Sequence, residues 1–195
     1  DAQAQRIIGV YVSGDTSSSE DLHAGVDVAG TLGINIQAIS DYVTGIYAQG
    51  ESGVTASGVS INIQSEKEGA VVYGIQSVAN PKYYPGPGSV NVNENTLLKL
   101  SGKGDLVGVL SMGAMNDRGS FVGLNGSSVV NVVSEDGTAV GIAVQEQAYA
   151  EIANLTANIE TKSTSLDKEA IGIDLDNAEL RTSGANSIYA QGDNA

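Results

Sequence analysis

The chain consists of short apolar segments in which hydrophobic and polar residues alternate, and residues that favour turns separate the segments. The clearest segments hold a glycine between apolar neighbours, and the residue after this marker glycine is always Val or Ile. Six segments have this form: IIGVYV at Gly9, VTGIYA at Gly45, VYGIQS at Gly74, LVGVLS at Gly108, AVGIAV at Gly141 and AIGIDL at Gly172. Apolar residues that recur with a period of two indicate strands with one buried face.

The marker glycines recur at intervals of 29 to 36 residues, and repeats of this length are typical of solenoid proteins. A second pattern, an asparagine between apolar residues, lies 17 residues after several of the marker glycines, although Asn131 competes with Asn125 for one of the places. Alternation sends these asparagines to the face opposite their apolar neighbours. The shared offset therefore predicts an outward polar stripe formed by Asn62, Asn91, Asn125 and Asn158.

The spacing favours an all-β fold, a parallel β-helix (β-solenoid) with about six irregular rungs of roughly 29–36 residues. Clusters of Gly, Ser, Asn and Asp interrupt the apolar segments, and no sustained helical period is present, so we expect very little helix. A β-sandwich is the alternative, but its strands need not repeat one signature at one offset. We expect a single domain over 1–195, part of a longer protein, with one buried column formed by Ile46, Ile75, Val109, Ile142 and Ile173.

Composition and charge narrow the possible functions. Val, Ile, Leu and Ala supply most of the hydrophobic content, with one Phe and no Trp, so the core is built from small branched side chains. The net charge of −14 repels nucleic acids and anionic membranes, and no apolar run approaches the ~20 residues of a membrane helix. Because the chain has no Cys, it has no disulfide, thiolate metal site or Cys nucleophile.

The candidate chemistry is sparse. His23 is the only histidine, which excludes a metal site built from several histidines. Asp174 and Asp176 share the outward face of one strand, but the outward column that contains Asp174 has no second acid: it reads Tyr11, Tyr47, Gln76, Leu110, Ala143, Asp174. The acidic turn at Ser134–Gly137 could accept calcium, although the calcium-binding nonapeptide repeat is absent. We expect no catalytic residue, no metal and no cofactor.

The segment IYAQG occurs twice, at Ile46–Gly50 and Ile188–Gly192, and AVGI and AIGI recur beside it. In these motifs the chain resembles the passenger region of autotransporters, the type V secretion proteins of Gram-negative bacteria. The resemblance implies a β-helical segment at the cell surface or secreted, of the kind that acts in adhesion and biofilm formation. Proteolytic passengers have a Gly-Asp-Ser-Gly-Ser motif, and Gly14-Asp15-Thr16-Ser17-Ser18 does not match it.

A loop insertion at 80–88 holds all three prolines together with Tyr83 and Tyr84. Tyrosines on a rigid loop are suited to recognition, and the alternative is that they fold back over the wall of the solenoid. Asn62, Asn91, Asn125 and Asn158 are the other binding candidates, and here the alternative is amide stacking that only satisfies the sheet surface. We expect a non-catalytic adhesin or self-association module whose partner is a surface protein or glycan of a host or neighbouring bacterium. A carbohydrate-active enzyme (polysaccharide lyase or hydrolase) and a structural spacer are the alternatives.

Overall fold

The computed structural model describes residues 5–14, 24–79, 87–114 and 119–192. Within these ranges the chain forms sixteen strands and no helix, and the strands pair in parallel. Strands make up 72% of the structure, which confirms the expected all-β class. Among these residues none forms a helix that could cross a membrane.

One wall of the molecule is a six-stranded parallel sheet, called sheet A here. Its strands come from six successive repeats, and each contains one marker glycine. In order along the sheet they are β1 (Arg6–Ser13), β3 (Tyr42–Gln49), β5 (Val71–Val78), β8 (Asp105–Met112), β11 (Ala139–Gln145) and β14 (Ala170–Asp176).

The remaining strands form a second sheet that bends into two walls, called wall B and wall C. The long strands β2 (Ala24–Ala38) and β4 (Ser52–Ser65) turn the corner and contribute to both walls. Wall B continues with β6 (Gly88–Val92), β9 (Phe121–Leu124), β12 (Tyr149–Ala153) and β15 (Glu179–Ser183). Wall C continues with β7 (Thr96–Gly102), β10 (Ser128–Ser134), β13 (Leu155–Thr161) and β16 (Ser187–Gly192).

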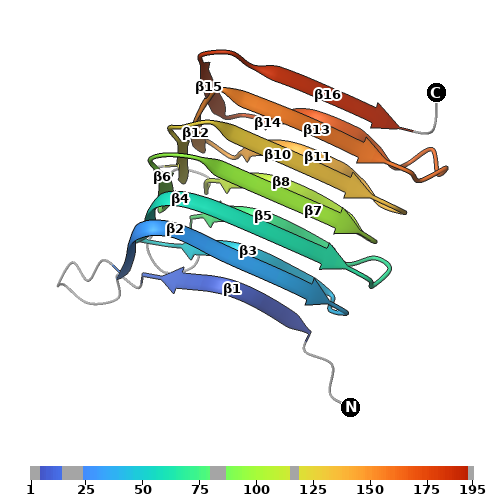
Figure 1. Cartoon of the computed structure of the whole chain (residues 1–195), viewed down its shortest axis with the longest axis horizontal. Coiled ribbons are helices and arrows are strands. Elements are labelled where there is room, and N and C mark those ends of the chain that lie inside the picture. Colours follow the sequence, from blue (N-terminus) through green and yellow to red (C-terminus); the bar gives the residue numbers. More distant parts are fainter. Residues whose placement is uncertain (1–4, 15–23, 80–86, 115–118, 193–195) are drawn as a thin grey trace.

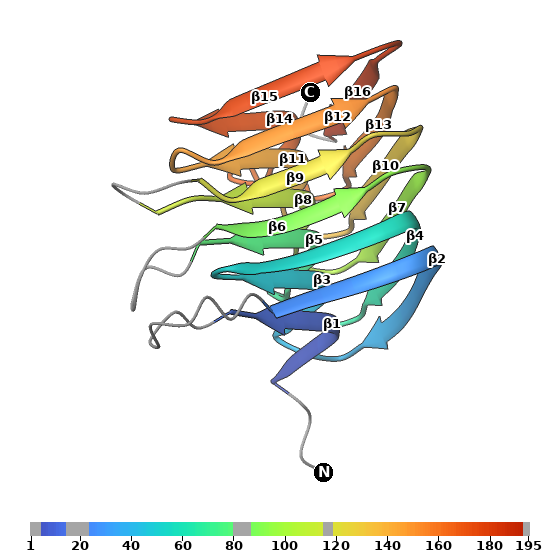
Figure 2. The same cartoon turned by 90° about the vertical axis from the view of Figure 1, so that its left-hand side faces the viewer.

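The chain visits sheet A, wall B and wall C in turn, so it winds as a three-walled β-solenoid of about five turns. Figure 1 shows the strands of wall C stacked at the front with sheet A behind them. Figure 2 shows wall B facing the viewer. The predicted parallel β-helix is confirmed.

The predicted column of apolar residues after the marker glycines stacks in register along sheet A. Ile46, Ile75, Val109 and Ile142 are fully buried, whereas Ile173 is half-buried because β14 is the last strand of the sheet. Together with inward residues from walls B and C, the four fully buried residues form one continuous core along the axis. Burial of each side chain of this size stabilises the fold by roughly 1.5–3 kcal/mol.

The marker glycines also form a column, and the structure explains why they lack side chains. A Cβ at Gly108 would lie 2.6 Å from the carbonyl oxygen of Gly141 and 2.6 Å from Cγ1 of Val130. The residues before and after each marker glycine remain in register between neighbouring strands. In β5 and β8, for example, Tyr73 pairs with Val107 and Ile75 with Val109. Val72 and Ile75 both belong to the core. The alternation of inward and outward side chains along the strand therefore shifts by one residue at the glycine.

Candidate functional site

The predicted stripe of Asn62, Asn91, Asn125 and Asn158 is wrong, because these residues lie on different parts of the surface. Asn62 and Asn158 are on wall C, Asn91 is on wall B beside Thr55, and Asn125 follows β9 at the corner between the walls. The cause is the connection from sheet A to wall B, which is short after β3 and β11 but longer after β5 and β8. An offset of 17 residues therefore leads to wall C in some turns only.

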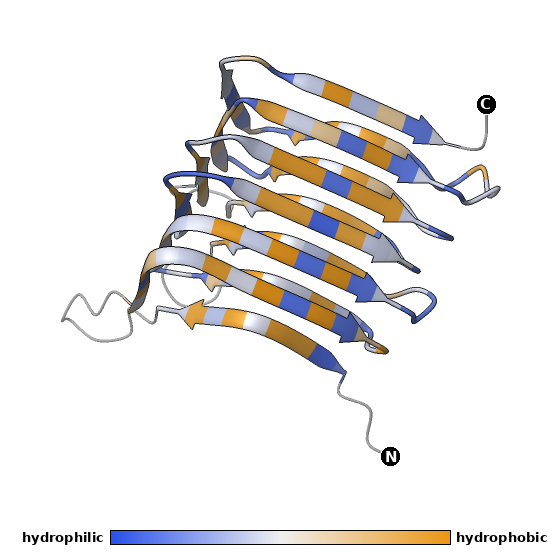
Figure 3. Cartoon of the chain, viewed as in Figure 1, coloured by the Kyte–Doolittle hydropathy of each residue, from blue (hydrophilic) through white to orange (hydrophobic). Residues whose placement is uncertain are grey.

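Wall C does have a polar column, which we call the Asn column. The amide of Asn62 donates to Oδ1 of Asn35 at 3.0 Å, and the amide of Asn158 donates to Oδ1 of Asn131 at 2.8 Å. Lys99 lies in register between the two pairs. The hydrophilic positions are visible along the front strands in Figure 3. The paired amides satisfy one another, which agrees with the amide-stacking alternative, and Asn131 rather than Asn125 occupies the disputed place.

Several other candidates from the sequence lie outside the described residues. These are Tyr83, Tyr84, His23 and the stretch from Asp15 to Ser18.

Asp174 and Asp176 lie where the alternation predicted, next to Ala143 and Gln145 of the neighbouring strand. The amide of Gln145 donates to Oδ2 of Asp174 at 2.8 Å. In the part of the chain that the structure describes, no group of three or more His, Cys, Asp and Glu side chains is arranged to hold a metal ion.

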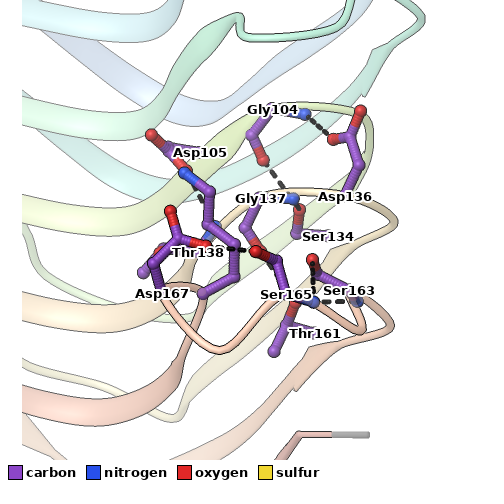
Figure 4. A network of polar contacts seen from close by, with 11 residues as sticks. Gly104, Asp105, Ser134, Asp136, Gly137, Thr138, Thr161, Ser163, Ser165 and Asp167 are labelled. Carbon is purple, nitrogen blue, oxygen red and sulfur yellow. Dashed lines mark hydrogen bonds and ion pairs between the residues drawn. The ribbon is translucent and has the colours of Figure 1, made fainter. Parts of the chain in front are cut away.

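The acidic turn after β10 belongs to a network of hydrogen bonds at the corner between wall C and sheet A (Figure 4). Oδ1 of Asp136 accepts from the amide of Gly104 at 2.6 Å, and the hydroxyl of Ser134 donates to the carbonyl of Gly104 at 2.7 Å. The hydroxyl of Thr161 donates to the carbonyl of Gly137 at 2.7 Å. These side chains satisfy backbone groups at turns, which would otherwise be buried without partners.

The outer face of sheet A holds a group of aromatic side chains, which we call the tyrosine cluster: Arg6, Tyr11, Tyr42, Tyr47 and Tyr73. The rings of Tyr11 and Tyr47 stack with centroids 5.3 Å apart, and those of Tyr42 and Tyr73 lie 5.7 Å apart. The guanidinium of Arg6 lies 4.8 Å from the centroid of Tyr42 and 5.0 Å from that of Tyr47. Tyr11 is 53% exposed, so the cluster reaches solvent at the first strand.

Two phenols of the tyrosine cluster, those of Tyr47 and Tyr73, lie in a partly desolvated environment. Burial raises the pKa of Tyr47, and the nearby Tyr42 adds to this shift while Arg6 opposes it. Burial also raises the pKa of Tyr73, with further contributions from Tyr42 and Asp105. Oε1 of Gln76 accepts hydrogen bonds from the hydroxyls of Tyr42 and Thr44, so the buried side chains of Thr44 and Gln76 have hydrogen-bond partners.

Beside the tyrosines, the same face carries a hydrophobic cluster that is separate from the interior core, called here the outer apolar cluster. Leu110, Val140 and Ala143 form its buried centre, and partly buried residues surround them: Tyr73, Val107, Met112 and Ile171. The centre of this cluster is covered within the chain itself, so the part that a partner could reach is the set of partly buried residues around it. An apolar patch on an outer face is a common mark of an interaction surface.

The signal for this face is present in the sequence. The outward column from Tyr11 to Asp174 contains two tyrosines, Leu110 and Ala143, and an outward position that is apolar in several turns is not explained by the interior core. Comparisons with models of protein families, with curated proteins and with solved structures find no match to this chain.

Proposed function

We propose that this protein is a non-catalytic recognition module, an adhesin or self-association segment that acts at a bacterial cell surface or after secretion. The partner is a surface protein of a host cell or of a neighbouring bacterium, and the outer face of sheet A is the surface that binds it. The β-solenoid fold is compatible with an autotransporter passenger, the family that the repeated motifs resemble.

The observation that supports this proposal is the joint presence of the tyrosine cluster and the outer apolar cluster on one wall. Protein interfaces are enriched in Tyr, Met and Arg and depleted of charged residues at their centre. The outer face of sheet A has this composition, although the chain as a whole has a net charge of −14. Recognition spread over a wall is common in solenoid proteins, because stacked repeats create an extended surface.

The test places a charge in the outer apolar cluster without touching the core. Val107 and Ile171 are both partly exposed, so Val107→Lys combined with Ile171→Lys should fold normally. The matched control is Val129→Lys with Val133→Lys, which changes two partly exposed valines of wall C. Binding of the labelled chain to epithelial cells and its sedimentation velocity would be measured for both variants. Each measured interaction should weaken by about tenfold or more in the sheet A variant only, because central interface residues dominate binding energy.

Equal binding by the two variants would refute the assignment to sheet A.

Incubation with pectin, other acidic glycans and peptide substrates, with and without calcium, tests the non-catalytic part of the proposal. No turnover above buffer is expected. Turnover that disappears in Asp174→Asn would favour the carbohydrate-active enzyme instead.

A further inference from the structure

Wall B contains a trough that is separate from the outer face of sheet A. Its floor is formed by Gly25 of β2, Gly53 of β4 and Ser89 of β6, which are adjacent in register. The hollow has a volume of about 660 Å³, and its rim includes Asp27, Glu51 and Thr55. Two further hollows open along the same wall, next to β12 and β15.

The glycines of the floor are not required by the fold, unlike the marker glycines of sheet A. A Cβ at Gly25 would meet only the carbonyl oxygen of Gly53, at 4.0 Å, and one at Gly53 would meet a movable hydroxyl, that of Ser89, at 3.0 Å. Neither glycine has a positive φ. Since larger residues could be built at Gly25 without a clash, what the glycine provides is open space above the sheet.

The polar groups of the trough are arranged along the axis. Asp27, Thr55 and Asn91 occupy one outward column in successive strands, next to the column of Gly25, Gly53 and Ser89. A carboxylate accepts hydrogen bonds, whereas hydroxyl and amide groups both donate and accept them. This combination complements the hydroxyl groups of a sugar chain, which also donate and accept.

An aromatic ring follows the trough on the side of the later turns, one strand beyond the Ser89 edge of the hollow. Phe121 follows Ser89 in register, and its ring stacks on Tyr149 of the next strand with centroids 5.5 Å apart and an interplanar angle of 22°. The ring lies over Gly123 beside Asn91, since a Cβ at Gly123 would be 2.9 Å from ring atoms of Phe121 and 2.8 Å from Oδ1 of Asn91, and Phe121 is partly exposed. From Gly25 through the trough to Phe121 the wall spans three strand spacings, about 14 Å, which is long enough for a short oligosaccharide.

We propose that this trough binds a neutral oligosaccharide that extends along the wall, with sugars hydrogen-bonded to Asp27, Thr55 and Asn91 and one sugar against the exposed part of the Phe121 ring. The carboxylates of Asp27 and Glu51 repel an anionic polysaccharide. A cationic peptide is a poorer match, because two carboxylates pair with few lysines and leave the hydroxyls and the aromatic face without a role. The site does not depend on the proposed function, since it lies on another wall.

The experiment fills the trough and leaves the backbone unchanged. Gly25→Leu places a side chain on the floor, and Gly33→Leu is the matched control, because a Cβ at Gly33 meets no atom within 4 Å and Gly33 is paired with Ser60 of wall C. Cello-, manno- and chito-oligosaccharides are the neutral probes, polygalacturonate is the anionic probe and oligolysine is the cationic one. Binding is measured by calorimetry, and unfolding of each variant is followed by circular dichroism.

We expect at least one neutral oligosaccharide to bind the parent chain, Gly33→Leu to bind it equally, and Gly25→Leu to lose roughly tenfold or more in affinity. Phe121→Ala and Asp27→Asn should each weaken the same binding by several-fold, because each removes one contact. The proposal is overturned if no neutral probe binds, or if Gly25→Leu binds the neutral probe as tightly as the parent chain does. It is also overturned if the substitution Gly25→Leu weakens the binding of polygalacturonate or oligolysine instead. Loss of cell binding in the Val107 and Ile171 variant does not affect this result.

Discussion

Substitution of one marker glycine tests the stacking of sheet A most directly. In Gly108→Ala the added methyl group would lie 2.6 Å from the carbonyl oxygen of Gly141 and 2.6 Å from Cγ1 of Val130. The carbonyl belongs to the next strand and cannot rotate away as a side chain would, so β8 and β11 must separate locally. The matched control is Gly33→Ala, where the new methyl group meets no atom within 4 Å.

The expected cost in Gly108→Ala combines two effects. Overpacking of a well-packed interior costs about 1–3 kcal/mol, and lengthening a sheet hydrogen bond adds about 0.5–1.5 kcal/mol, which together give about 1.5–4.5 kcal/mol. Gly33→Ala should be neutral or slightly stabilising, by up to about 1 kcal/mol, because alanine reduces the entropy of the unfolded chain.

Urea unfolding followed by far-ultraviolet circular dichroism measures both free energies of unfolding under the same conditions. The midpoint should fall clearly in Gly108→Ala and stay near that of the parent chain in Gly33→Ala. If the two variants unfold at the same urea concentration, the glycine column is not held by close contact between strands, and the explanation given for the repeat is wrong.

Four further outcomes are expected, the first three from the structure and the last from the sequence. Ile142→Asp places an unpaired charge in the fully buried column and should abolish cooperative unfolding, as measured by urea titration. Thr161→Val leaves the carbonyl of Gly137 without its donor and should lower the free energy of unfolding by about 1–3 kcal/mol. Because burial raises the folded-state pKa of Tyr47, the neutral phenol stabilises the fold below its unfolded pKa, and this stability is lost as the pH rises through the folded value. Tyr47→Phe should therefore reduce the loss of thermal stability at alkaline pH. Tyr83→Ser with Tyr84→Ser should weaken cell binding with little change in melting temperature if that segment recognises the partner; earlier melting with unchanged binding would mean that the two tyrosines pack on the wall.

The sequence by itself determined the class of fold and the register of one wall. The six marker glycines and the Val or Ile after each were sufficient to align β1, β3, β5, β8, β11 and β14, and the structure pairs these segments in the predicted order. This was possible because the repeat has a local cause. Each strand needs an inward apolar residue, and at the glycine position the carbonyl oxygen of the next strand lies too close to leave room for a side chain.

The outward column of sheet A can be recognised in the sequence, but only the tertiary structure decided what lies on the outer faces of walls B and C. Whether Asn91 faces the same side as Asn62 depends on how many residues the chain uses to pass from sheet A to wall B, and that length differs between turns. Likewise, Gly25 and Gly108 are the same type of residue, but Gly25 leaves open space on wall B whereas Gly108 lies in close contact with the next strand. An outward position has no packing requirement of its own, so its neighbours in space, which come from other turns, determine whether it forms a site.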